Sequence, residues 1–196
     1  MSSTAPNAAG IDSAFSAIEE TGIPGCVEIK THVRGDARGR FVKTFHAEWF
    51  KAHGLRTDFV EQYYSVSSKG VLRGLHFQKP PAHHAKLVYC VEGAVLDAAV
   101  DLRPGSPAFG RHALREISAE RANLLYIPEG LAHGFYVLSE SATLIYAVTS
   151  VYDAACDAGI HWNSAGIAWP DRNPTVSQRD RQFASFEESA GIFRGM

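Results

Sequence analysis

The stretch KLVYCVEGAVLDAAVDL, residues 86–102, carries the clearest structural signal in this chain. It holds two runs rich in valine, leucine and alanine, and Gly93 stands between them. A glycine between two short apolar runs is typical of a tight turn that joins neighbouring strands. We therefore expect two antiparallel strands here.

Similar runs lie on both sides of this pair, separated by glycine, proline and aspartate residues. They include VEIKTHV (27–33), FVKTF (41–45), FVEQYYSVS (59–67), ANLLYIPEG (122–130) and ATLIYAVTSVY (142–152). Many short strands with regular turn signals predict an antiparallel β-sandwich or barrel. Helices are expected to be accessories, chiefly over residues 47–54, where Trp49, Phe50 and His53 share one face before a glycine.

Length and composition predict the domain organisation. The chain has 196 residues, a formal net charge of −2 and 45% hydrophobic residues, which suits one domain with a well-filled core. We expect residues 1–22 to form a mobile N-terminal tail and residues 23–196 to form this domain. The polar, irregular C-terminal segment is expected on the surface, where Phe183 and Phe186 could anchor it to the body.

Charge and cysteine content limit the functional classes. The chain has 19 Lys and Arg against 21 Asp and Glu, so it offers no basic field for duplex nucleic acid. Cys26, Cys90 and Cys156 lie far apart without a CxxC pair, which favours a reducing compartment. The sequence shows neither a signal peptide nor a membrane-spanning apolar run, and we expect a cytoplasmic protein.

Polar side chains that could carry chemistry recur along the predicted strands. In LRGLHFQ (72–78), strict alternation would place Arg73 and His76 on opposite faces of one strand. A closed barrel could gather around His76 four polar residues of other segments, namely Lys86, Asp97, His133 and Tyr146. Three of these four also have a structural interpretation, as a loop contact, a turn cap or a core aromatic with its hydroxyl satisfied.

The histidines allow a metal site as an alternative. His83 and His84 are adjacent, so in an extended strand their rings point to opposite faces and cannot both bind one ion. A site formed by His76, His84 and His133 would make the protein a metal-binding barrel or a sugar-binding module. The sequence contains no GxGxxG, P-loop, GxSxG or HExxH motif.

Several longer motifs resemble those of a known family. They are DARGRF (36–41), SSKGVLRGLHFQKPP (67–81), KLVYCVEGAVLDAAVDLRPGSPAFG (86–110), LYIPEGLAHGFYVLSE (125–140) and GIHWNSAGIAWP (159–170). In this combination the chain, from about residue 23 to residue 186, resembles the dTDP-4-dehydrorhamnose 3,5-epimerases of the cupin superfamily. The resemblance implies a jelly-roll β-barrel or sandwich, a nucleoside-diphosphate 4-keto-6-deoxy sugar as substrate, and no metal or organic cofactor.

The resemblance also implies catalytic roles. His76 matches the base that removes a proton next to the sugar ketone, and Asp180 matches the carboxylate that orients the imidazole. Lys86 matches the cation at the ketone oxygen, where negative charge develops. Tyr146 matches the donor that returns a proton from the opposite face of the sugar, and Tyr152 is the nearest alternative.

Further residues match the substrate-binding positions of the family. Arg73 matches a contact to the diphosphate, which suits a planar guanidinium, and Asp97 and His133 match pocket residues. Arg38 and Phe41 match residues that reach into the site of a neighbouring subunit and hold the nucleotide. The resemblance therefore implies a homodimer with exchanged N-terminal strands.

Two segments depart from the family pattern. This chain has Lys43 where members usually have Glu, and EQYYS (61–65) where they usually have QDNHS. Glu61 and Tyr63 are therefore expected to face substrate as altered recognition residues. The nucleotide base and the number of inverted carbons stay open, and a 3,4-ketoisomerase on the same fold is the alternative enzyme.

Overall fold

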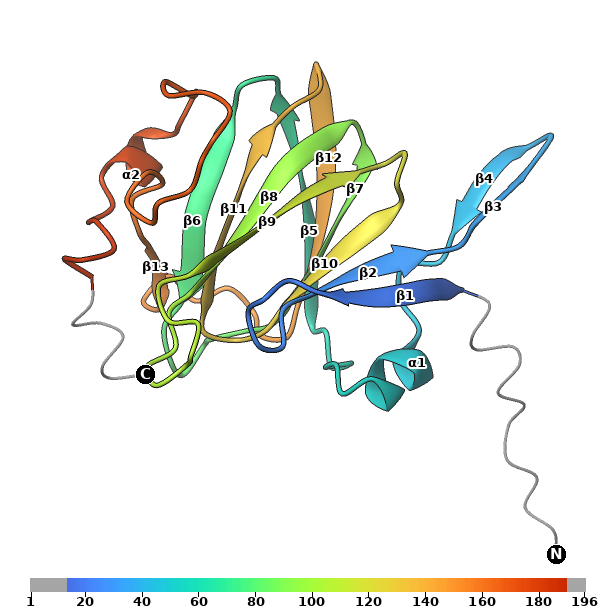
Figure 1. Cartoon of the computed structure of the whole chain (residues 1–196), viewed down its shortest axis with the longest axis horizontal. Coiled ribbons are helices and arrows are strands. Elements are labelled where there is room, and N and C mark those ends of the chain that lie inside the picture. The colour runs from blue at the N-terminus through green and yellow to red at the C-terminus, as the bar shows by residue number, and fades with distance from the viewer. Residues whose placement is uncertain (1–13, 190–196) are drawn as a thin grey trace, which may run out of the picture.

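Two antiparallel sheets form the body of the molecule (Figure 1). The structure, a computed structural model, describes residues 14–189. The six-stranded sheet has the order β1 (Phe15–Glu20), β2 (Val27–Thr31), β10 (Asn123–Ile127), β7 (Lys86–Glu92), β12 (Ser141–Val148) and β5 (Glu61–Ser68). The five-stranded sheet has the order β13 (Asp157–Gly159), β6 (Leu72–Gln78), β11 (Leu131–Val137), β8 (Ala94–Asp101) and β9 (His112–Ser118).

The main core lies between these two sheets, because alternate side chains of each strand point inward. Its buried members include Val88, Leu125 and Leu144 from one sheet and Val95, Phe135 and Val137 from the other. The all-β fold of jelly-roll type, with short accessory helices, is the predicted one and is confirmed.

Each sheet also has a covered outer face. The helix α1 (Ala47–Ala52) buries Trp49 and Phe50 against the six-stranded sheet, as the apolar face of the predicted helix requires. The C-terminal segment lies beside β6 and contains α2 (Gln178–Arg181) (Figure 1). Phe186 packs against the cluster on the outside of the five-stranded sheet, so this segment is anchored to the body.

The N-terminal part of the sheet begins earlier than expected. The sequence analysis assigns residues 1–22 to a tail, yet β1 pairs with β2, with one register shift between Phe15 and Ala17. Phe15 is buried and stacks on Trp49 with 4.3 Å between ring centroids. The sequence FSAIEE does not predict this strand, because apolar and polar residues alternate only weakly along it. Residues 1–13 of the expected tail lie outside the described residues.

A register shift in β6 changes which residues share a face. His76 lies opposite His133 and Arg73 opposite Phe135, so three residues of β6 span the distance of two residues of β11. The expectation that Arg73 and His76 point to opposite faces is therefore wrong, because the extra residue is a bulge that brings both into one cavity. Glycine is required at position 74, where a Cβ would lie 2.6 Å from the Gly134 Cα.

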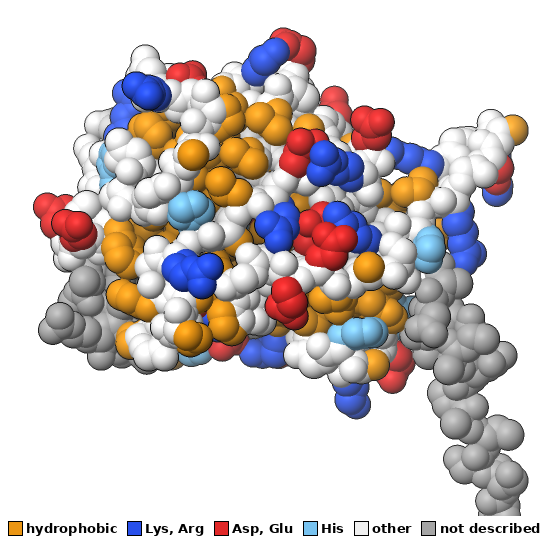
Figure 2. Space-filling view, in the orientation of Figure 1, with side chains coloured by type: hydrophobic (Ala, Val, Ile, Leu, Met, Phe, Trp, Pro, Cys, Tyr) orange, Lys and Arg blue, Asp and Glu red, His pale blue; other side chains and the backbone are white. Residues whose placement is uncertain are grey.

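A hairpin extends away from the sheets. It consists of β3 (Val33–Asp36) and β4 (Gly39–Val42), and its tip stands clear of the body in the space-filling view (Figure 2). Within residues 14–189, no helix is long and apolar enough to cross a membrane.

Candidate active site

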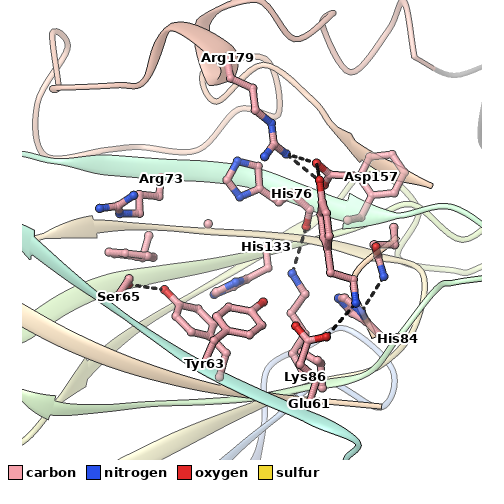
Figure 3. A pocket seen from close by; sticks show the side chains of 17 residues that line it. Glu61, Tyr63, Ser65, Arg73, His76, His84, Lys86, His133, Asp157 and Arg179 are labelled. Atoms are coloured by element: carbon pink, nitrogen blue, oxygen red, sulfur yellow. Dashed lines mark hydrogen bonds and ion pairs between the residues drawn. The ribbon is translucent and has the colours of Figure 1, made fainter. Parts of the chain in front are cut away.

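A cavity of about 380 Å³ lies between β5 and β12 on one side and β6 and β11 on the other (Figure 3). Eight of the residues predicted to form the site line it, namely Glu61, Tyr63, Arg73, His76, Lys86, His133, Tyr146 and Tyr152. The two walls belong to different sheets, because β5 and β12 are neighbours in the six-stranded sheet and β6 and β11 in the five-stranded sheet.

His76, which is partly exposed to the cavity, pairs with the buried Asp180 of α2. The His76 Nε2 and the Asp180 Oδ1 are 2.8 Å apart, and Oδ2 accepts a hydrogen bond of 3.0 Å from the Gly74 amide. Burial alone would raise the pKa of Asp180, but the bonds from His76, Gly74 and the Ser177 cap hold that pKa below its usual value. The ionised carboxylate favours the tautomer of His76 that carries its proton on Nε2.

The imidazole of His76 is suited to accept a proton. Burial lowers the pKa of His76, an effect that Asp180 opposes and that the charges of Lys86 and Arg179 reinforce. The ring is therefore neutral near pH 7, and Nδ1 is the nitrogen with a lone pair. The side chain is 31% exposed, so a molecule in the cavity can reach it.

Lys86 brings a positive charge into the cavity. It begins β7, is 5% exposed, and its Nζ donates a hydrogen bond of 3.4 Å to the carbonyl oxygen of His76. Burial lowers the pKa of Lys86 to about 8, although Asp97 and Asp157 favour the charged form. At neutral pH the ammonium is thus mostly charged, yet incompletely hydrated.

Tyr146 lines the cavity from the wall opposite His76. Its ring stacks on Tyr63 with centroids 4.9 Å apart, and its hydroxyl lies 3.0 Å from the Ser65 Oγ. Burial raises the pKa of Tyr146 above its usual value, and the bond to Ser65 opposes that change. The phenol therefore keeps its proton at neutral pH.

Two more predicted residues form a pair on the five-stranded sheet. The His133 Nε2 lies 2.9 Å from both carboxylate oxygens of Asp97, and Asp97 is fully buried. His133 lines the cavity, whereas Asp97 lies behind it and does not. The predicted direct contact of Asp97 with a ligand is thus replaced by a contact to His133.

The mouth of the cavity is crossed by a chain of polar contacts. The Tyr152 amide donates a hydrogen bond of 2.9 Å to Glu61, and the Tyr152 hydroxyl donates one of 3.4 Å to Asp157. Asp157 also pairs with Arg179 at 2.8 Å. The contacts link β5 to the C-terminal segment, and Figure 3 shows Arg179 and Asp157 together at this edge.

Two predicted site residues lie outside the cavity of their own chain. Arg38 is at the tip of the hairpin, where it pairs with Asp36, and its side chain is 90% exposed. Phe41 lies on β4 and is 60% exposed. Neither residue lines the cavity.

The sequence analysis did not select four polar residues that line the cavity, namely Ser65, Gln78, Asp157 and Arg179, and it considered a fifth, His84, only as a ligand of the alternative metal site. Two of them had a usable signal, because Ser65 shares a strand face with Tyr63, and Arg179 directly precedes Asp180. Asp157 had none, since nothing in the sequence shows that β13 pairs with β6.

The alternative metal site does not form from the proposed histidines. The Nε2 atoms of His76 and His133 already bond to separate carboxylates. The Nδ1 of His84 lies 3.2 Å from both Gln78 and Ser150. Within the described part of the chain, no three His, Cys, Asp or Glu side chains are grouped so that they could hold a metal ion.

Comparisons with known proteins show to which family this chain is similar. The family model described as dTDP-4-dehydrorhamnose 3,5-epimerase matches residues 20–188. The Shigella flexneri dTDP-4-dehydrorhamnose 3,5-epimerase is 44% identical over 82% of this chain and 91% of its own length. The Streptomyces niveus dTDP-4-dehydrorhamnose 3-epimerase is 39% identical over 82% of this chain and 79% of its own.

A solved structure shows the same relationship. The 3,5-epimerase of Legionella pneumophila, crystallised with dTDP-4-keto-L-rhamnose, is 36% identical to this chain. It superposes with a TM-score of 0.83 over 87% of this chain and 93% of its own. Together with the family model, which spans most of the sequence, these matches show that the chain belongs to the dTDP-4-dehydrorhamnose 3,5-epimerase family.

Proposed function

We propose that this protein is an isomerase that epimerises a nucleoside-diphosphate 4-keto-6-deoxy sugar by proton transfer. The observation that carries the proposal is the placement of His76 and Tyr146 on opposite walls of one cavity, with Lys86 also in its lining. Inversion of a carbon requires a base on one face and an acid on the other. The family assignment supports the same chemistry.

The first step removes a proton from a carbon next to the ketone. Nδ1 of His76 accepts this proton, and Asp180 stabilises the imidazolium that results. The electron pair of the broken C–H bond moves toward the ketone oxygen, which becomes negatively charged. The Lys86 ammonium stabilises this enolate, and a low-hydration site strengthens that interaction.

The second step returns a proton to the same carbon from the other side. Tyr146 is the donor, because its raised pKa keeps the phenol protonated until the carbanion forms. Tyr152, the alternative donor, is 60% exposed and bonds to Asp157 at the cavity mouth. Burial therefore favours Tyr146 as the acid.

The remaining lining residues hold the substrate. Arg73 contacts the diphosphate, and its Nε is held by the Ser67 Oγ at 2.9 Å. His133, fixed by Asp97, lies on the cavity wall and contacts the sugar. Glu61 and Tyr63 contribute to nucleotide or sugar selectivity on β5. Relatives include both 3,5-epimerases and a 3-epimerase, so inversion at two carbons or at one carbon fits the same site.

The proposal includes a homodimer in which N-terminal strands are exchanged. The exposed hairpin supports it, because Arg38 and Phe41 extend away from the cavity of their own chain. Tyr64 and Val66 add exposed apolar surface along β5, the edge strand of its sheet. The buried, unpaired cysteines support a cytoplasmic location.

Solvent deuterium tests the proposed reaction. In D₂O, turnover of the dTDP-linked 4-keto-6-deoxy sugar should place deuterium on the carbon that is inverted, as NMR and mass spectrometry will show. His76→Ala should abolish both deuterium incorporation and inversion, because it removes the imidazole that accepts the proton. Inverted product that retains its original protium would contradict the mechanism.

A further inference from the structure

Two serines of β5 each hold a polar side chain of the cavity. Along this strand, Ser65 and Ser67 share a face because side chains alternate. The Ser65 Oγ lies 3.0 Å from the Tyr146 hydroxyl, and the Ser67 Oγ accepts a hydrogen bond of 2.9 Å from the Arg73 Nε. One strand thus supports both the proposed acid and the proposed diphosphate contact.

The phenol of Tyr146 is fixed at its ring and at its oxygen. Tyr63 lies directly opposite Tyr146 in the β5–β12 register, and the two rings are inclined by only 19°. Ser65 reaches the phenol oxygen from two residues further along β5. A ring clamped in this way can turn its hydroxyl only within a narrow range.

Loss of the phenol proton creates a charge in a poorly hydrated place. Tyr146 is 6% exposed, so water stabilises a phenolate there only weakly. The Ser65 hydroxyl is free to rotate, and it can accept a hydrogen bond from the phenol or donate one to the phenolate. Both states of the acid can therefore be bonded to the same serine without movement of the backbone.

We propose that Ser65 is a positioning residue that aims the Tyr146 phenol at the substrate carbon and stabilises the phenolate after proton transfer. This inference rests on the epimerase function proposed above. In the step it assists, the phenol O–H bond breaks, a C–H bond forms, and the Ser65 O–H turns toward the phenolate. Water then restores the phenol proton and accepts the proton held by His76.

The role of Ser65 can be tested by measuring how the enolate divides between return to substrate and conversion to inverted product. In D₂O, the proton that His76 has taken exchanges with solvent, and return of the resulting deuteron to the same face gives labelled substrate. Deuteron transfer from Tyr146 to the other face gives inverted product instead. Ser65→Ala should lower inverted product relative to labelled substrate by about 10- to 100-fold, the range expected for one hydrogen bond to a charged group. Ser65→Thr, which keeps a hydroxyl, should restore most of this ratio.

Matched variants on the same strand separate positioning from general damage. Ser67→Ala should raise the KM for the nucleotide sugar through Arg73 and leave the partition ratio near that of the wild type. Ser68→Ala changes an exposed side chain of the other face and should alter neither quantity. Thermal unfolding checks that each variant is folded. If Ser65→Ala proves unstable, Ser65→Cys is used in its place, because the cysteine thiol is of similar size and is only a weak hydrogen-bond donor.

The outcomes distinguish this inference from the proposed function. An unchanged partition ratio in folded Ser65→Ala or Ser65→Cys overturns the role of Ser65, as does an equal defect in Ser65→Thr. Absence of deuterium from the sugar in the wild-type reaction overturns the proposed function instead. A lowered ratio that Ser65→Thr restores, with Ser67→Ala affecting KM alone, supports the assignment.

Discussion

The floor of the cavity and the β3–β4 hairpin are built in opposite ways. We use the word floor for four reacting-centre residues from both walls of the cavity, namely His76, Lys86, His133 and Tyr146, and each of these side chains has a hydrogen-bond partner in its own chain. On the hairpin, Phe41 is 60% exposed, and Arg38 pairs with Asp36 of the same turn.

This difference suits the floor to proton transfer and the hairpin to nucleotide binding. Proton transfer needs groups that are fixed to within a fraction of an ångström, and paired strands with buried partners provide that rigidity. A hairpin that contacts nothing in its own cavity is suited to serve a second subunit. We infer that one chain completes the reacting centre, while nucleotide recognition needs its partner.

The largest expected effect comes from removing the charge on the floor. Lys86→Met keeps much of the buried volume but leaves no cation at the ketone oxygen, so kcat should fall by about 10²–10³. Steady-state kinetics measure this loss, and KM should change much less. Lys69→Met is the matched control, because Lys69 is a surface lysine paired with Glu140. A Lys86→Met enzyme with near-normal kcat would remove Lys86 from the mechanism.

The pH profile tests the same floor through its titrating groups. The base must be neutral, so kcat/KM should fall at acid pH, below the lowered pKa of His76. Lys86 must be charged, so kcat/KM should also fall about tenfold per pH unit above the Lys86 pKa of about 8. Lys86→Arg should shift this alkaline limb upward, since a guanidinium stays protonated there. An alkaline limb unchanged by that substitution would assign it to another group.

Sequence patterns predicted the sheets well, because strand periodicity and turn residues act locally. The runs around Gly93 became β7 and β8, and the apolar face of residues 47–54 became α1. β1 was not predicted because its pattern is weak, and because the stacking of its Phe15 on Trp49 is a contact between residues far apart in the chain. The bulge in β6 was not predicted, because strict alternation of side chains cannot show that Gly74 lies close to Gly134 on the neighbouring strand.

Site residues that lie in the family motifs could be predicted from the sequence. Site residues that only the fold brings to the cavity could not. The motifs predict His76, Lys86 and Tyr146 as site residues, and all three line one cavity. Ser65 was not selected, because a serine on a strand has no signal of its own until its neighbour across the sheet is known. Asp157 reaches the cavity mouth only through the pairing of β13 with β6.

The smallest expected effect lies on the hairpin. Phe41→Ala removes an exposed aromatic ring that has no contact with the cavity of its own chain. If this ring holds the nucleotide of a partner subunit, KM should rise about three- to tenfold, the value of one aromatic contact, with kcat nearly unchanged. Val33→Ala is a control on the same hairpin, because Val33 is also exposed but was not assigned a role in nucleotide binding.

Mixing two defective chains shows which cavity the hairpin serves. In a heterodimer of Phe41→Ala and His76→Ala chains, exchange of hairpins would join an intact His76 in one chain with an intact Phe41 from the other. That site is complete, so the heterodimer should turn over substrate with the wild-type KM. The Phe41→Ala homodimer turns over substrate only with a raised KM, and the His76→Ala homodimer is inactive. If each hairpin serves its own chain, no complete site can form, and the mixture keeps the raised KM. Such a result would mean that each chain binds its nucleotide without the hairpin of its partner, and the proposed difference in role between floor and hairpin would be wrong.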